Sequence, residues 1–77
     1  MERLEVLSRL QGIFRDVLDN EEIVINEETT ANDIEEWDSL TNVQLVVEIQ
    51  KVFGKKFPAK EIIAWKSVGD IINAINI

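Results

Sequence analysis

The chain has 77 residues and a formal net charge of -7, and it contains neither cysteine nor histidine. A chain of this length forms one small domain, and the missing residue types exclude disulfides, thiolate ligands and the commonest general base. We therefore expect a protein that is not an enzyme and that holds no metal. A net charge of this sign disfavours nucleic acid and anionic membranes as partners, because both select clusters of Lys and Arg.

The acids are concentrated in the first half of the chain. Residues 1–38 hold most of the fifteen acids, whereas residues 39–77 hold all of the lysines. This asymmetry favours a partner with a basic surface. No apolar run reaches the roughly 18 residues of a transmembrane helix, and no cationic segment precedes an apolar one at the N-terminus. We expect a cytoplasmic monomer.

The first predicted helix spans residues 2–19, where apolar residues recur at helical spacing with polar residues opposite them. Asp19-Asn20 ends this pattern. The apolar face contains Val6, Leu7, Leu10, Ile13, Phe14, Val17 and Leu18.

Residues 20–38 form a long acidic segment without Lys or Arg. Ile23-Val24-Ile25 has no second strand with which to pair, so we expect a loop anchored on the core. Asn32 followed by Glu35 is typical of a capping box and predicts one helical turn. Trp37 is expected to close the base of the loop. The acids lack the alternating ligands and central glycine of an EF-hand, which argues against a calcium site of that type.

The second predicted helix begins where this loop ends, at Asp38-Ser39. Asp38 is a favourable N-cap residue. Ser39 then presents its hydroxyl to solvent beside amide N–H groups without intrahelical partners, and such a position suits an anion. On these two residues alone, a plain helix cap is the simpler interpretation.

The second helix, residues 39–53, has apolar residues on two sides of the helical wheel. One side is expected to face the core and contains Asn42, Leu45, Val46, Ile49, Val52 and Phe53. On the other side, Leu40, Val43 and Val47 lie next to one another and next to Ser39. Scattered apolar residues are normal on surfaces, but a contiguous strip beside a modifiable serine indicates a docking surface.

Gly54 is expected to end this helix in the left-handed conformation. A short helix is predicted from Pro58 to Trp65, and its expected anchors are Ile62, Ile63 and Trp65. Ser67 with Asp70 predicts the cap of a last helix, whose apolar stripe contains Val68, Ile71, Ile72 and Ile75. The pattern as a whole predicts an all-α fold of three principal helices and one short helix.

These residues resemble the acyl carrier protein family. Asp38-Ser39-Leu40 matches the attachment motif of that family. Its second helix is matched by Val43-Gln44-Leu45-Val46, Glu48-Ile49 and Phe53-Gly54. The likeness extends over nearly the whole chain and includes the acidic loop and the Ser67-capped last helix.

The resemblance implies a small four-helix bundle that forms a single domain, residues 1–77. It implies that Ser39 accepts 4'-phosphopantetheine from coenzyme A through a separate phosphopantetheinyl transferase, and that the thiol of this arm holds acyl groups as thioesters. Partner enzymes would dock through basic patches onto Glu35, Asp38 and Glu48, and through apolar pockets onto Leu40, Val43 and Val47. The residues that would line an acyl pocket are Asn42, Val46, Ile62 and Ile63, although an ordinary packed core fits the sequence equally well.

The chain departs from the family at Thr41 and Gln44, where carriers of fatty acid synthesis usually have acids. We therefore expect a secondary pathway, polyketide-like or polysaccharide-decorating, rather than housekeeping fatty acid synthesis. Two alternatives remain. An acidic helical interaction module without a prosthetic group explains the charge and the apolar strip equally well, and a peptidyl carrier shares the arm but is usually less acidic.

Overall fold

A computed structural model describes residues 2–76 and contains four α-helices. The helices are α1 (Arg3–Val17), α2 (Ser39–Phe53), α3 (Ala59–Ala64) and α4 (Val68–Ile75). No strand is present among residues 2–76, so the predicted all-α architecture of three principal helices and one short helix is confirmed. None of the helices in this range is long and apolar enough to cross a membrane.

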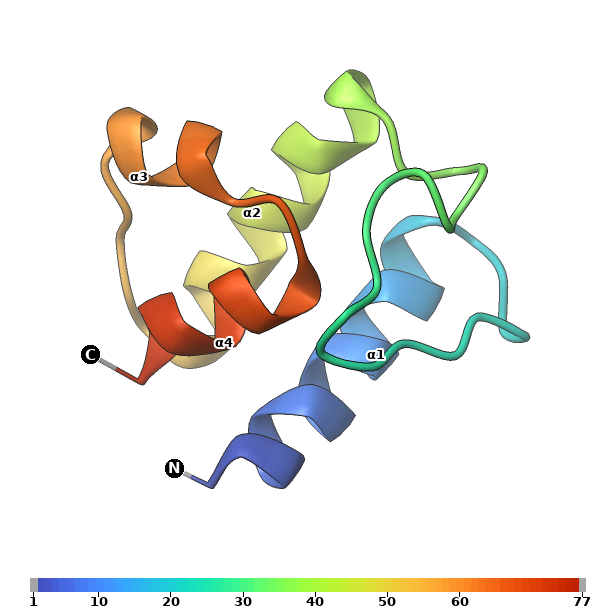
Figure 1. The fold of residues 1–77 in the computed structure, drawn as a ribbon, viewed down its shortest axis with the longest axis horizontal. Helices are drawn as coiled ribbons and strands as arrows, with labels where there is room; N and C mark the ends of the chain where they lie inside the picture. Colours follow the sequence, from blue (N-terminus) through green and yellow to red (C-terminus); the bar gives the residue numbers. More distant parts are fainter. Residues whose placement is uncertain (1, 77) are drawn as a thin grey trace.

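The hydrophobic core lies between α1, α2 and α4 and is closed by the loop after α1 (Figure 1). Apolar side chains at helical spacing on each of the three helices point into it, which is why these segments pack as amphipathic helices. Its most deeply buried members are Val6, Leu10, Phe14, Leu45, Ile49, Val68, Ile71 and Ile72. Removing these side chains from water is the main source of stability available to so short a chain.

The loop of residues 20–38 is tied to α1 by side-chain hydrogen bonds to its backbone. Arg15 Nε donates to the carbonyl oxygen of Ile23 at 2.7 Å, and the Ile25 amide donates to Gln11 Oε1 at 3.1 Å. Ile23 and Ile25 are buried, whereas Val24 between them is 75% exposed. The expected anchoring of this loop on the core is therefore confirmed.

The loop is also tied to the start of α4. The Val68 amide donates to the carbonyl oxygen of Thr29 at 2.9 Å, and the Gly69 amide donates to that of Glu27 at 2.8 Å. These two donors belong to the first turn of α4 and have no partner within the helix. A Cβ at position 69 would lie 2.9 Å from the Glu27 carbonyl oxygen, so this close approach requires glycine.

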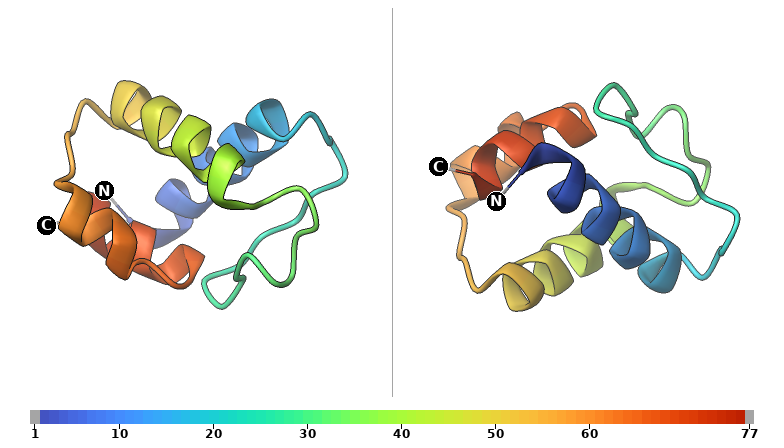
Figure 2. Two further views of the ribbon diagram at one scale, coloured as in Figure 1. Left: turned by 90° about the horizontal axis from the view of Figure 1, so that it is seen from above. Right: turned by 90° about the horizontal axis from the view of Figure 1, so that it is seen from below.

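Arg3 of α1 also contacts both the loop and α4. Its guanidinium forms an ion pair with Glu27 of the loop, and Nη1 donates to Asn73 Oδ1 of α4 at 2.7 Å. The first turn of α1 and α4 lie side by side in both views of Figure 2, which agrees with this contact. One side chain thus connects three segments that are far apart in the sequence.

The structure corrects three details of the sequence analysis. The helical turn expected at Asn32–Glu35 is absent, because the capping interaction forms two residues earlier: the Thr30 amide donates to Asp33 Oδ2, and the Asp33 amide donates to the Thr30 carbonyl, both at 2.9 Å. Pro58 precedes the first residue of α3 and does not occupy its first turn.

The third correction concerns Val52, which was expected in the core and is 42% exposed. Val52 lies within roughly 20° of Leu45 on an ideal helical wheel, two turns later along α2. Leu45 is buried, so the layer that covers this side of α2 ends before the last turn of the helix. The wheel fixes the direction of a side chain but does not show where the neighbouring helix stops.

Candidate functional site

Ser39 is the first residue of α2, and its side chain is exposed. Within residues 2–76 its hydroxyl forms no hydrogen bond, so the oxygen is available to an external reagent. Serine is common at this end of helices because it can serve as a cap, but here the capping is done by its neighbour. The Ser39 hydroxyl is therefore not needed to hold the helix.

Asp38 is the N-cap of α2, as predicted. Its Oδ1 accepts from the amides of Leu40 and Thr41, each at 2.9 Å, and Thr41 Oγ1 accepts from the Asp38 amide at 2.8 Å. These contacts form a reciprocal capping box in which Thr41 takes the place of the usual Glu. They also correct the expectation of free amide donors beside Ser39, because Asp38 already uses those of Leu40 and Thr41.

The charge of Asp38 is stabilised by the same contacts. The Thr41 amide makes the largest contribution, and together with the Leu40 amide it lowers the pKa of Asp38 below its ordinary value. Hydrogen bonds to a carboxylate favour its charged form. Asp38 is therefore ionised at neutral pH, with Oδ1 bonded to the backbone of its own helix.

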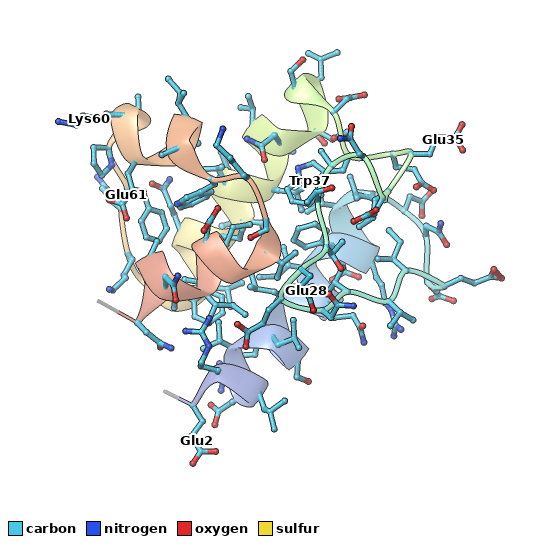
Figure 3. The ribbon with its side chains drawn as sticks, viewed as in Figure 1. Glu2, Glu28, Glu35, Trp37, Lys60 and Glu61 are labelled. Carbon is cyan, nitrogen blue, oxygen red and sulfur yellow. The ribbon has the colours of Figure 1, made fainter. Side chains whose placement is uncertain are left out.

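Trp37 fixes the backbone just before Ser39. Its Nε1 donates to Asn42 Oδ1 on α2 at 3.0 Å, and its ring packs edge-on against Phe14 of α1 with centroids 4.9 Å apart. The side chain is 8% exposed, and it lies toward the middle of the molecule in Figure 3. The prediction that Trp37 closes the base of the loop is confirmed.

A pocket of about 220 Å³ opens beside Ser39. Its walls come from the end of the loop, the first turn of α2 and the segment between α3 and α4. They are formed by Ala31, Trp37, Asp38, Ser39, Asn42, Trp65 and Lys66. A second hollow of about 390 Å³ lies within the loop, near Val24 and Thr29, and does not include Ser39.

The residues expected to dock partners lie as follows. Leu40, Val43 and Val47 on α2 are 78%, 63% and 56% exposed, so the apolar strip faces solvent. Glu35 is exposed and points away from the molecule in Figure 3, and Asp38 is exposed as well. Glu48 is half-buried.

The four candidates for an acyl pocket do not form one group. Asn42 lines the pocket beside Ser39, whereas Val46, at 8% exposed, and the half-buried Ile62 are not among its walls. Ile63 is 81% exposed on α3, so it is not the buried anchor that was expected, and it is not among the walls of the pocket beside Ser39. Two turns of helix cannot show from spacing alone which side faces the protein.

The sequence analysis missed Lys66 and the role of Trp65 in the wall of the pocket beside Ser39. Trp65 was expected to be an anchor, and Lys66 was not considered. Both precede the Ser67 cap of α4, and the fold places them in the wall of the same pocket as Ser39. No spacing pattern along the sequence connects positions so far apart.

Within the part of the chain that the structure describes, no group of three or more acids is arranged to hold a metal ion. Two of the loop acids are engaged by other segments or side chains. Glu27 pairs with Arg3 of α1. Glu36 Oε2 accepts a hydrogen bond from Asn20 Nδ2 at 2.8 Å.

Comparison with known proteins gives the same family from sequence and from structure. A family model described as a phosphopantetheine attachment site matches residues 8–75. The chain is 32% identical over 77 residues to an acyl carrier protein of Thermosynechococcus vestitus, a match that covers 99% of this chain and 94% of that protein. It is 34% identical over 61 residues to an acyl carrier protein of Rubrobacter xylanophilus, covering 79% and 75% of the two chains.

A solved structure is similar as well. The solution structure of a holo acyl carrier protein from Geobacter metallireducens superposes with a TM-score of 0.85 at 40% sequence identity. The match covers 91% of this chain and 80% of that chain.

Proposed function

The chain belongs to the acyl carrier protein family, and from this premise we propose that Ser39 carries its phosphopantetheine arm. The observation that supports this proposal is an exposed serine hydroxyl, free of hydrogen bonds within residues 2–76, at the edge of an open pocket. Ser8 lies on α1 and Ser67 caps α4, so neither has comparable surroundings.

The protein is a carrier and not a catalyst. It holds a covalently attached 4'-phosphopantetheine and interacts with a phosphopantetheinyl transferase and with enzymes that handle acyl groups. The arm supplies a thiol that binds acyl groups as thioesters. This division of labour fits a chain without cysteine or histidine, because its own side chains offer neither a thiol nor an imidazole base.

The surroundings of Ser39 fit a phosphodiester. Lys66 lines the adjacent pocket and brings a positive charge to it, and the N-terminal end of α2 adds the positive end of the helix dipole. The nearby Asp38 carboxylate would oppose a phosphate, but the amides of Leu40 and Thr41 offset part of its charge. The chain therefore tolerates an anionic ester at this position.

The test is to incubate the protein with coenzyme A, Mg²⁺ and a broad-specificity phosphopantetheinyl transferase and to measure its intact mass. We expect the mass of the wild type and of Ser8→Ala to increase by one arm, and that of Ser39→Ala to stay unchanged. Melting curves should be alike for all three, because Asp38 caps α2. An arm on Ser39→Ala would overturn the assignment, and no arm on any variant would favour an interaction module without a prosthetic group.

The docking surface that we propose combines the exposed strip Leu40, Val43 and Val47 with the acids Glu35, Asp38 and Glu48. The strip lies on α2, within three turns of Ser39, so an enzyme that contacts it also reaches the arm. The acids would steer a basic partner, and the aliphatic side chains would fill apolar pockets on it.

Val47→Glu tests this surface, with Leu4→Glu as the matched control because Leu4 is an exposed apolar residue on α1. We expect Val47→Glu to slow loading by the transferase severalfold at an unchanged melting temperature, and Leu4→Glu to leave the rate unaffected. Equal rates for the two variants would exclude the strip from the docking surface.

We further propose that this carrier serves a secondary pathway, polyketide-like or polysaccharide-decorating. The first turn of α2 contains no acid, and Thr41 in that turn belongs to the capping box. Gln44 in the second turn is neutral as well. An enzyme that selects carriers by acids along this helix would be steered weakly.

Gln44→Glu tests this proposal by restoring one acid on the exposed side of α2. With an acyltransferase of fatty acid synthesis, we expect the variant to be acylated faster than the wild type at low salt and equally fast at high salt. Gln44→Ala controls for the loss of the amide. A wild type that is already as good a substrate as a fatty acid synthesis carrier would exclude the secondary pathway.

A further inference from the structure

The charge of the surface changes sign between the two ends of α2. Residues 20–38, which lead into the start of this helix, are rich in acids and contain no Lys or Arg. Residues 51–60, which begin in its last turn, contain four lysines and no acid. The helix has fifteen residues, so its two ends lie roughly 20 Å apart. The net charge of -7 is therefore the sum of regions of opposite sign.

Three of these lysines follow one another where α2 ends, and we call Lys51, Lys55 and Lys56 the basic end of α2. Lys51 lies in the last turn, and the other two follow Gly54, which ends the helix in the left-handed conformation. Lys55 is half-buried, and its Nζ donates to the carbonyl oxygen of Ala74 at 3.4 Å. Lys51 and Lys56 are exposed and form no ion pair within residues 2–76. The charges of these two lysines are available to a partner.

The basic end continues the proposed docking strip. Lys51 follows Val47 by one turn and lies within roughly 40° of it on an ideal helical wheel, so the two side chains leave α2 on the same side. Val47 is 56% exposed, and Val52 in the last turn adds apolar surface with an exposure of 42%. An enzyme that lies along the strip, away from Ser39, therefore meets Lys51 next.

Stabilisation of the helix does not by itself account for the basic end. A cation in the last turn of a helix is favoured by the helix dipole, and this explains Lys51. The effect is weak beyond the last turn, where Lys56 lies. Glu48 precedes Lys51 by three residues, but it is half-buried and forms no ion pair with that lysine within residues 2–76. The fold thus leaves the positive charge of this end without a compensating acid.

We propose that the enzyme that docks on the strip has two patches of opposite charge: a basic patch that faces Glu35 and Asp38, and an acidic patch that faces the basic end of α2. This inference rests on the proposed docking surface and specifies the chemistry of its partner. Two such patches fix the direction in which the enzyme lies along α2, because the reversed complex would bring like charges together. An enzyme with a uniformly basic docking surface is repelled at the basic end and so is selected against.

The first test uses an acyltransferase of fatty acid synthesis whose docking patch is basic. Titration calorimetry measures its affinity for the unloaded protein, so no arm is required. At low salt we expect Lys51→Glu to bind about two- to fivefold more tightly than the wild type, because a repulsion becomes an attraction. The gain should disappear at high salt.

Lys60→Glu is the matched control for this titration. It makes the same change in net charge, but Lys60 lies on α3 and points away from the molecule in Figure 3. We expect it to bind like the wild type. Should Lys51→Glu lower the melting temperature, Lys51→Gln takes its place with a smaller expected gain. Equal gains for the Lys51 and Lys60 variants, or no gain at Lys51, would overturn the proposal.

The second test gives the same enzyme an acidic patch. The Lys and Arg residues of its docking patch are replaced by Glu one at a time, and each variant is titrated with the unloaded protein. We expect one replacement to tighten the binding of the wild type and of Lys60→Glu but to weaken that of Lys51→Glu. Such a change of sign in a double-mutant cycle would place the new acid opposite the basic end. If every replacement weakens the binding of the wild type, the proposal fails.

The same titration separates this proposal from the docking surface on which it rests. If Val47→Glu leaves the affinity unchanged, the strip itself fails as a docking surface. If Val47→Glu weakens binding while Lys51→Glu does not strengthen it, the strip stands and the acidic patch is excluded.

Two other occupants of the basic end have measurable signatures. Self-association in sedimentation that Lys51→Glu abolishes would assign the basic end to a second copy of this chain. Binding to vesicles of phosphatidylcholine and phosphatidylserine that the same variant loses would assign it to a membrane. Either result would overturn the proposal, and we expect a monomer that does not bind these vesicles.

Discussion

The loop of residues 20–38 and the segment of residues 54–66, which includes α3, lie at opposite ends of the bundle (Figures 1 and 2). The longer of the two, which contains no helix, is the better anchored. It buries Ile23, Ile25, Ile34 and Trp37 and also the polar Thr29. By contrast, α3 buries none of its residues and has no side-chain cap.

Regular secondary structure is therefore a poor guide to rigidity in this protein. A helix of two turns is marginal unless tertiary contacts support it, whereas a loop whose amides and carbonyls are satisfied by neighbours can be firmly held. Ser39, the proposed attachment site, follows the firm segment, and Trp65 belongs to the weakly anchored one.

The largest effect expected from this contrast is that of Trp37→Ala. The change removes a buried ring, its contact with Phe14 and its hydrogen bond to Asn42, and it should cost about 3–5 kcal/mol. Trp65→Ala should cost less, since its ring is half-buried and loses no hydrogen bond. Urea unfolding of both variants measures the difference. Equal losses would mean that the two segments are equally anchored.

Gly69→Ala should have the next largest effect. The added Cβ would lie 2.9 Å from the Glu27 carbonyl oxygen, and because this atom is backbone the loop must move away from α4, at a cost of about 1–3 kcal/mol. Gly12→Ala is the matched control, because nothing lies within 4 Å of its Cβ, and it should stabilise α1 by about 0.5–1 kcal/mol. Thermal unfolding of the pair checks both signs.

Lowering the pH should break the ion pair between Arg3 and the loop residue Glu27 and so reduce the stability of the fold. The hydrogen bond from Arg3, followed by the charge of its guanidinium, holds the pKa of Glu27 below the ordinary value. A carboxylate whose pKa is lower in the folded state contributes stability above its unfolded pKa of about 4, and this stability is lost as the pH falls through the folded pKa.

Glu27→Gln should therefore lower the melting temperature at pH 7 and flatten its decline below about pH 4. Glu35→Gln, on the exposed side of the same loop, is the control and should leave the curve close to that of the wild type. A wild-type decline that persists in full in Glu27→Gln would assign the acid sensitivity to other carboxylates.

The smallest effect is expected for Ile63→Gln. The side chain is 81% exposed, and substitutions at such positions usually change stability by less than about 0.5 kcal/mol. Ile34→Ala in the loop is the contrasting change and should cost about 2–4 kcal/mol, because the side chain is 8% exposed. A large loss from Ile63→Gln in denaturant unfolding would show that α3 packs more tightly than its exposure indicates.

The sequence by itself determined the four helices, the caps of α2 and α4, and the place of Ser39 at the start of α2. The signals were local: apolar residues at helical spacing on α1 and α4, Asp38 before α2, Gly54 in the left-handed conformation after it, and the Ser67–Asp70 box before α4. Each depends on residues within one or two turns of one another, so the chain order alone reveals them.

Only the tertiary structure decided how far these elements cover one another. It exposes Val52 and Ile63, gives two amides of α4 to carbonyl groups of the loop, and brings Trp65 and Lys66 to Ser39. Such contacts join residues that are distant in the chain, and they depend on where a neighbouring segment begins and ends. The spacing of residues along a sequence predicts on which side of a helix a side chain lies. It does not predict which residues of another segment that side chain contacts.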